Sequence, residues 1–220
     1  MKIGVLAMQG GYDAHLKMLN ERMEIDACPV RVSEELKQVD ALILPGGEST
    51  TIIKLLQRIR LDEVIKARVS AGMPIFGTCA GMILLAKRIQ DRPDQPTLSL
   101  MEITVARNAF GRQVDSFEAD IQFNFAPIKS ENSPDNEEVG AENLGDSDEY
   151  NPKTVRGVFI RAPYIIEKDE TVETLGVYRD KIVAVRQRNL LATAFHPELT
   201  EDTRVHREFV KMIKLSQERR

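Results

Sequence analysis

Cysteine is scarce in this chain of 220 residues. Cys28 and Cys79 are the two cysteines, and they do not form a Cys-x-x-Cys pair. Two isolated thiols supply neither a disulfide framework nor the ligand spacing of a zinc site, so the sequence predicts no metal site and no cofactor bound through sulfur. Cys28 precedes a proline and has no glycine turn beside it, which is typical of a small packed hydrophobe.

Long hydrophobic runs and an excess of basic charge are also missing. No apolar run approaches the roughly 20 residues that cross a bilayer, and the run at residues 3–8 is too short for a signal peptide. The net charge is −4, which argues against nucleic acid as the main partner. We therefore expect a cytoplasmic protein that binds neither nucleic acid nor a membrane.

Buried strands alternate with amphipathic helices over the first ninety residues. Continuous apolar runs at residues 3–8, 41–44 and 74–76 are typical of strands buried on both faces. A helix is predicted after each of them, the last over residues 80–89. This alternation predicts the α/β class, with a doubly wound, mostly parallel sheet and helices on both faces. The length suits a single domain over residues 1–220.

The pattern changes in the second half of the chain. Strands are predicted at residues 98–107, 117–123 and 154–163, followed by further short ones. Residues 129–153 contain eight acidic residues against two lysines, for a net charge of −6, and few apolar residues. Such a segment buries too little apolar surface to pack. We interpret it as a flexible acidic insertion, with an acidic docking segment as the alternative.

Cys79 lies in the stretch Gly77-Thr78-Cys79-Ala80-Gly81, between a predicted strand and a predicted helix. This is the setting of a nucleophile elbow, in which a sharp turn strains the nucleophile's backbone and glycines let strand and helix approach. The partial positive charge at the helix N-terminus favours a thiolate. Cys79 is therefore a candidate nucleophile, and a packed thiol is the alternative.

A second glycine-rich turn follows the strand at residues 41–44. Gly46 and Gly47 allow successive backbone N–H groups to point the same way, which forms a pocket for an anion or an oxyanion. Open α/β sheets bind ligands at the carboxyl ends of their strands. We predict that the oxyanion donors are the N–H groups of Gly47 and of Ala80, the residue after the nucleophile.

The three histidines of the chain are His15, His196 and His206. A cysteine nucleophile needs a base. We expect His15 to be at the surface or locally bonded, and His206 to be at the surface of a charged helix. His196 ends an apolar strand, and Glu198 falls on its side of an extended backbone, which the intervening proline favours. Cys79, His196 and Glu198 thus predict an acyl-transfer triad.

Three motifs carry a resemblance to a known family. They are Pro45-Gly46-Gly47-Glu48-Ser49-Thr50, Gly77-Thr78-Cys79-Ala80-Gly81-Met82 and His196-Pro197-Glu198. In this order and spacing, the chain resembles a class I (triad) glutamine amidotransferase of flavodoxin-like fold. More narrowly, it is similar to the glutaminase subunits of pyridoxal 5′-phosphate synthases. The supporting segments are residues 4–10, 103–108, 110–117 and 159–163.

The resemblance implies a reaction and a partner. Cys79 would attack the side-chain amide of glutamine and form a glutamyl thioester, while His196 moves the proton and Glu198 orients it. The ammonia would pass to a synthase subunit that makes pyridoxal 5′-phosphate (vitamin B6), in a hetero-oligomer and without a cofactor on this chain. The residues implied to bind glutamine are Gly47, Glu48, Ser49, Arg107, Ile160 and Arg161. Arginine is also suited by itself to clamping a carboxylate.

The resemblance also implies that the glutaminase is poorly active until it docks on the synthase. We therefore expect the oxyanion turn to rearrange, and residues 8–10 are our candidate docking face.

Two alternatives remain. One is another triad glutaminase, such as that of imidazole glycerol phosphate synthase, and the other is a non-enzymatic α/β module with a reactive cysteine. Residues 110–117 and 159–161 favour the vitamin B6 branch, and a non-enzymatic module has no need for the pair His196 and Glu198.

Overall fold

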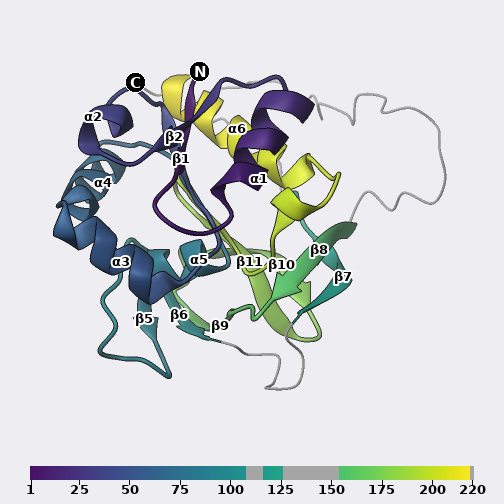
Figure 1. Ribbon diagram of the computed structural model, residues 1–220. Helices are drawn as coiled ribbons and strands as arrows, with labels where there is room; N and C mark the ends of the chain where they lie inside the picture. Colours follow the sequence, from purple (N-terminus) through teal and green to yellow (C-terminus); the bar gives the residue numbers. More distant parts are fainter. Residues whose placement is uncertain (108–115, 126–153, 219–220) are drawn as a thin grey trace.

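The computed structural model describes residues 1–107, 116–125 and 154–218 (Figure 1). Strands and helices alternate at first, and strands dominate later. The strands are β1 (Ile3–Leu6), β2 (Ala27–Val30), β3 (Ala41–Leu44), β4 (Ile75–Thr78), β5 (Ala86–Ile89), β6 (Met101–Ala106), β7 (Ser116–Phe123), β8 (Thr154–Ile160), β9 (Tyr164–Lys168), β10 (Glu173–Tyr178), β11 (Lys181–Gln187) and β12 (Leu190–Thr193). The helices are α1 (Tyr12–Lys17), α2 (Ser33–Leu36), α3 (Ser49–Arg58), α4 (Leu61–Ser70), α5 (Ala80–Leu85) and α6 (Arg204–Glu218), with a π-helical turn η1 (Met18–Arg22) and a 3-10 turn η2 (Pro197–Leu199).

The parallel part of the sheet has the strand order β2-β1-β3-β4-β12, and every neighbouring pair in it is parallel. Strands β1, β3, β4 and β12 are buried along their whole length. Their continuous apolar runs follow from this, because a strand covered by helices on both faces has no solvent side. The predicted doubly wound α/β class is confirmed.

Helices cover the two faces of these parallel strands. Phe76 of β4 contacts Phe209 of α6, whereas a Cβ at the next residue, Gly77, would meet Gly81 and Leu85 of α5. Since successive residues of a strand point to opposite faces, α6 and α5 lie on opposite faces of the sheet. Figure 1 shows α1 beside α6, and α3 beside α5.

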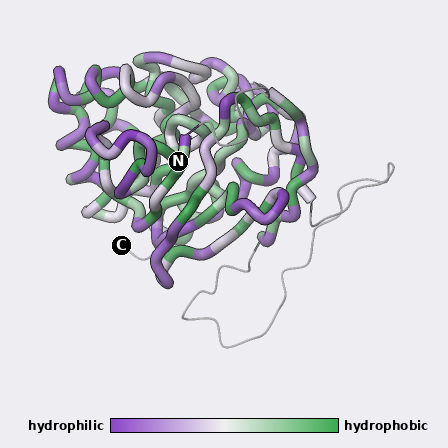
Figure 2. The backbone as a smooth tube through the Cα atoms, turned by 90° about the horizontal axis from the view of Figure 1, so that it is seen from below, coloured by the Kyte–Doolittle hydropathy of each residue, from purple (hydrophilic) through white to green (hydrophobic). Residues whose placement is uncertain are grey.

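The antiparallel part continues from β12 in the order β11-β10-β7-β8. Each neighbouring pair is antiparallel, and β9 branches from β11 to pair with β6, which pairs in turn with β5. Strands β6 and β7 alternate between buried and more exposed residues. This is the pattern of a sheet with one face on the core. Figure 2 shows hydrophobic segments of the backbone inside the molecule and hydrophilic segments at its periphery.

Two predicted elements differ from the structure. The helix predicted over residues 80–89 ends at Leu85, and residues 86–89 form β5. The chain leaves the helix because Ala86 and Arg88 pair with Met101 and Thr104 of β6, so tertiary pairing overrides the local apolar pattern. The acidic segment at residues 129–153 lies outside the described residues. Within the described part of the chain, no helix is long and apolar enough to cross a membrane.

Candidate active site

Cys79 occupies a sharp turn between β4 and α5. Its backbone has φ 49° and ψ −102°, in the positive-φ region that strains a residue with a side chain. Its N–H donates to the carbonyl oxygen of Thr193 at 2.8 Å, which ties the turn to β12. Gly81 allows the close approach that the turn requires, since a Cβ there would lie 2.0 Å from the carbonyl oxygen of Leu44. The structure therefore contains the predicted elbow.

His196 leaves the end of β12 and faces the elbow. Its N–H donates to the carbonyl oxygen of Val158 at 2.8 Å, and its Nδ1 lies 2.7 Å from Glu198 Oε1. An ionised carboxylate only accepts, so Nδ1–H donates to it and Nε2 is left for the thiol. The His196 side chain is also hydrogen-bonded to Cys79. The fold thus brings the three predicted triad residues together.

Glu198 reaches His196 through a turn rather than through an extended strand. Residues Pro197–Leu199 form η2, with proline at its start. Proline suits that position because its missing N–H would have no partner inside the turn. The contact between Glu198 and His196 was expected, but the extended backbone from which we inferred it was wrong. The side chain of Glu198 is 1% exposed, so its charge must be balanced by neighbours.

The buried pair is held in its charged form. Burial opposes the charged imidazole, but hydrogen bonds and charges of Cys79 and Glu198 raise the pKa of His196 to about 10. Burial also opposes the carboxylate, but the neighbouring imidazoles of His15 and His196 hold the pKa of Glu198 well below its usual range. An imidazolium oriented by a carboxylate can protonate a leaving amine.

Two further histidines lie behind the triad. The predictions of a surface His206 and of a surface or merely locally bonded His15 are wrong, because both side chains are fully buried. His15 lies on the helical face of Met18 and Leu19, which are three and four residues later and also buried. Apolar residues three and four positions after His15 indicate a buried helical face, so the burial of His15 could have been predicted from the sequence.

The Gly46–Gly47 turn packs directly against the triad. A Cβ at Gly46 would lie 2.2 Å from His196 Cε1, so only glycine leaves room for the imidazole. The carbonyl oxygen of Gly46 accepts from the N–H of Gly11 at 3.0 Å, and the N–H of Glu48 donates to Gln9 Oε1 at 2.7 Å. Both ends of the turn are therefore hydrogen-bonded to the segment after β1, through Gln9, which belongs to the predicted docking face at residues 8–10, and through Gly11, which follows it.

The predicted oxyanion donors lie at the ends of neighbouring strands. Gly47 follows β3, and Ala80 is the first residue of α5 after β4. The first N–H groups of a helix have no partner within it, so a helix start can offer a donor. A Cβ at Gly47 would lie 2.6 Å from Gln9 Oε1. The side chain of Gln9 thus occupies the space beside the turn that would receive an oxyanion.

Hydrogen bonds link three of the predicted glutamine-binding residues to Gln95 or to one another. Gln95 was not predicted from the sequence. Arg107 donates from Nη2 to Glu48 Oε1 at 3.3 Å and from Nη1 to Gln95 Oε1 at 2.8 Å. Gln95 Nε2 donates to Ser49 Oγ at 3.0 Å. Gln95 comes from an irregular loop, where nothing in the sequence distinguishes it from a solvated residue.

Ile160 and Arg161 lie where β8 ends. The carbonyl oxygen of Ile160 is 3.7 Å from Cys79 Sγ, so this strand end reaches the candidate nucleophile. A hydrogen bond from Thr50 lowers the pKa of Glu48 against the effect of burial, and the charges of Arg107 and Arg161 lower it further. The six predicted glutamine-binding residues therefore surround one place, at the ends of β3, β6 and β8.

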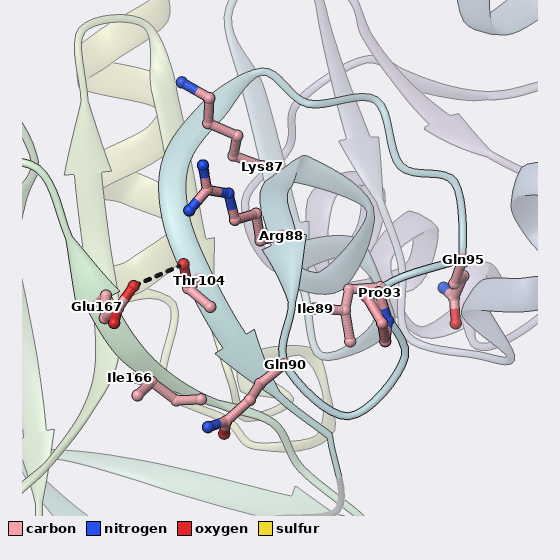
Figure 3. A pocket seen from close by; sticks show the side chains of 9 residues that line it. All are labelled: Lys87, Arg88, Ile89, Gln90, Pro93, Gln95, Thr104, Ile166 and Glu167. Atoms are coloured by element: carbon pink, nitrogen blue, oxygen red, sulfur yellow. Dashed lines mark hydrogen bonds between the residues drawn. The ribbon is translucent and has the colours of Figure 1, made fainter.

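A cavity of about 470 Å³ lies beside Gln95 (Figure 3). Figure 3 shows Thr104 of β6 hydrogen-bonded to Glu167 of β9, at 3.3 Å. The lining residues are Lys87, Arg88, Ile89, Gln90, Pro93, Gln95, Thr104, Ile166 and Glu167. Cys79 and His196 are not among them, so the cavity meets the candidate site only through Gln95. In residues 1–107, 116–125 and 154–218, no cluster of His, Cys, Asp and Glu is placed to hold a metal ion.

Comparisons with known proteins agree on one family. The model of the SNO glutamine amidotransferase family matches residues 5–215. The pyridoxal 5′-phosphate synthase subunit PdxT of Carboxydothermus hydrogenoformans is 48% identical, over 97% of this chain and 98% of its own length. The subunit of the same name from Thermosipho africanus is 45% identical, over 97% of this chain and all of its own.

Solved structures give the same fold. A crystal structure of a glutamine amidotransferase superposes with a TM-score of 0.79 at 44% identity, covering 96% of this chain and 98% of its own. The structure of PurLQS from Thermotoga maritima superposes with a TM-score of 0.61 at 16% identity, covering 98% of this chain and 95% of its own. The second likeness is one of fold alone.

Proposed function

The chain belongs to the SNO glutamine amidotransferase family, and from this premise we propose that Cys79, His196 and Glu198 carry out its reaction. Its function is that of the glutaminase subunit of a pyridoxal 5′-phosphate synthase, as the vitamin B6 reading of the sequence predicted. The observation that carries the triad proposal is the hydrogen-bonded series Cys79–His196–Glu198, assembled from the ends of two neighbouring strands, β4 and β12.

The first half of the reaction releases ammonia. The sulfur of Cys79 attacks the side-chain carbonyl carbon of glutamine, and the carbonyl oxygen becomes an oxyanion. The carbon–nitrogen bond then breaks, and His196 gives its proton to the leaving nitrogen, so that ammonia departs. The γ-glutamyl group stays on Cys79 as a thioester. Glu198 keeps the imidazole oriented, and its negative charge stabilises the imidazolium.

The second half regenerates the enzyme. His196, now neutral, takes a proton from a water molecule, and the resulting hydroxide attacks the thioester carbonyl carbon. The carbon–sulfur bond breaks, glutamate leaves, and the imidazolium again faces the sulfur of Cys79. Each turnover thus converts glutamine and water into glutamate and ammonia, without a cofactor on this chain.

We assign the oxyanion to the N–H groups of Gly47 and Ala80 and the glutamine to the residues around Arg107. Arg107 and Arg161 supply positive charge for the substrate's carboxylate, Glu48 supplies a negative group for its ammonium, and Ser49 lies within the same hydrogen-bonded cluster. Opposite charges at fixed positions distinguish glutamine from a simple amide.

The partner is a synthase subunit, and we place its docking face at residues 8–10. Gln9 holds the N–H of Glu48 and fills the space beside Gly47. A partner that moved Gln9 would free the turn to receive the oxyanion. The experiment is a glutaminase assay with and without a pyridoxal 5′-phosphate synthase subunit. We expect ammonia release chiefly with the synthase, and no release with either preparation contradicts the proposal.

The remaining proposals concern the chain as a whole. We propose that residues 1–220 form one domain, that the protein is cytoplasmic, and that residues 129–153 are a solvated insertion. Charge and composition support all three. Deleting residues 132–150 is expected to leave a folded, active glutaminase, and loss of soluble protein after this deletion contradicts the assignment of the insertion.

A further inference from the structure

Glu198 Oε1 has two imidazole neighbours, of which the triad mechanism uses only one. His196 Nδ1 lies 2.7 Å from this oxygen, and His15 Nε2 lies 3.4 Å from it. The side chains of His15 and Glu198 are 0% and 1% exposed, so their contact is screened little by solvent. The remaining oxygen, Oε2, is buried without a partner in the described part of the chain. His15 is thus the second donor available to this carboxylate.

The hydrogen bonds around His15 assign the position of its proton. Nε2 faces Thr78 Oγ1 at 3.2 Å as well as the Glu198 carboxylate. Because an ionised carboxylate only accepts, Nε2 carries the hydrogen. Nδ1 lies 3.1 Å from His206 Nε2. Thr78, Glu198 and His206 are therefore the hydrogen-bonding groups around this imidazole, with the ring of Phe76 at its edge.

His206 completes the arrangement. Its Nδ1 is buried and lacks a hydrogen-bond partner among the described residues. Burial lowers the pKa of His206 to about 3, so its ring is neutral and carries one hydrogen. A hydrogen on Nδ1 would be a buried donor without an acceptor, which is costly. The hydrogen therefore belongs on Nε2, where it is donated to His15 Nδ1, and His15 is left with its hydrogen on Nε2.

We propose that His15 is a positioning residue of the glutaminase reaction, a role that rests on the proposed function. Its Nε2–H holds the Glu198 carboxylate ionised and fixed toward His196 without touching the substrate. Without this donor, Glu198 would have one imidazole partner in a site where burial favours the neutral acid. A protonated or displaced Glu198 no longer stabilises the His196 imidazolium, so turnover would fall while glutamine binding stayed intact.

The test compares His15→Phe with His15→Gln in the complex with the synthase subunit. Phenylalanine keeps the ring volume and removes the donor, whereas a glutamine amide can supply an N–H near the place of Nε2. We expect His15→Phe to lower kcat about 10- to 100-fold, as loss of an outer partner of a functional group commonly does, with KM within about twofold. The acid limb of its kcat–pH profile should move to higher pH, because Glu198 would be protonated more easily.

Two controls separate positioning from packing and from failure of the proposed function. His15→Gln should recover most of the kcat lost in His15→Phe. Phe76→Leu disturbs the same buried cluster without removing a hydrogen bond, and should leave the acid limb in place. Wild-type kcat and pH profile in His15→Phe overturn the inference, as does an equal fall for Phe76→Leu. An inactive wild-type complex instead contradicts the proposed function.

A measurement on the wild-type protein keeps the inference testable if the variants do not fold. With three histidines in the chain, ¹⁵N-labelled histidine gives a spectrum simple enough to assign. We expect a protonated Nε2 and an unprotonated Nδ1 on His15 at neutral pH. An unprotonated Nε2 on His15 would mean that it donates nothing to Glu198, and this result overturns the proposal.

Discussion

The parallel and antiparallel parts of the sheet contribute different things to the candidate site. The parallel strands β3, β4 and β12 end at the Gly46–Gly47 turn, at Cys79 and at His196. The antiparallel part, with its β5-β6-β9 branch, contributes the ends of β6 and β8, where Arg107, Ile160 and Arg161 lie. Parallel neighbours end at the same edge, so they bring reacting groups together. The other part places charges around that edge.

This division predicts that mutations in the parallel part reduce turnover and that those in the antiparallel part weaken binding. The strands differ accordingly in their surroundings. The triad strands β4 and β12 are buried throughout, whereas β8 alternates between buried and less buried residues. Buried strands hold a geometry to within small tolerances, while a partly exposed strand tolerates substitution more easily.

The largest effect is expected for Cys79→Ala. Removing the thiol removes the covalent step, so ammonia release with the synthase should fall by about 10³-fold or more. Cys28→Ala is the matched control, because Cys28 lies on β2 of the same parallel part and away from the triad. Burial raises the pKa of the Cys28 thiol, so it is a poor nucleophile. Unchanged turnover in Cys79→Ala contradicts the mechanism.

The next effect is expected for Gly46→Ala. The new methyl group would lie 2.2 Å from His196 Cε1, so the imidazole must move out of line with Cys79. We expect kcat to fall about 100-fold, since small misplacements of reacting groups are costly. Gly176→Ala is the control in the antiparallel part, where the nearest atom would be Ala184 Cβ at 3.0 Å. It should lower the unfolding midpoint slightly and leave kcat unaltered.

A smaller effect, of a different kind, is expected for Arg107→Lys. Lysine keeps the charge but loses the fork that bonds both Glu48 and Gln95. We expect KM for glutamine to rise about tenfold with little change in kcat, in line with the loss of one charged hydrogen bond. Arg156→Lys, at an exposed position of β8, is the control and should change neither constant. A fall in kcat alone for Arg107→Lys would break the division between the two parts.

The smallest effect concerns stability against pH. The folded protein raises the pKa of His196 from 6.5 to about 10. The contribution of this shift to the free energy of unfolding is therefore complete below pH 6.5 and is lost as the pH rises toward 10. Glu198→Gln removes the carboxylate, which is one of the groups that raise the pKa of His196. Between pH 6.5 and 10, urea unfolding of the wild type should therefore lose about 1–2 kcal/mol more than that of Glu198→Gln. Equal losses of unfolding free energy in the wild type and in Glu198→Gln contradict a charged pair of His196 and Glu198.

The candidate site was predictable where chemistry and spacing coincide in the sequence. Three local patterns each marked the end of a predicted strand. They are Cys79 between two glycines, the glycine pair Gly46–Gly47, and His196 followed closely by Glu198. The structure adds Gln95, His15 and His206. The helical spacing of His15 to Met18 and Leu19 signals burial, but no local motif marks the contact of any of these three residues with the site. Gln95 gains its role from contacts with residues 12 and 46 positions away, and His15 from contacts up to 191 positions away.

By itself, the sequence determined the α/β class, the elbow and the residue types of the triad, because hydrophobic period, glycine and proline act over a few residues. Only the tertiary structure decided that residues 86–89 form a strand, that Glu198 approaches His196 through a turn, and that two further histidines lie buried behind it. These outcomes depend on pairing and burial between segments far apart in the chain, where the free energy of tertiary contacts exceeds local preference.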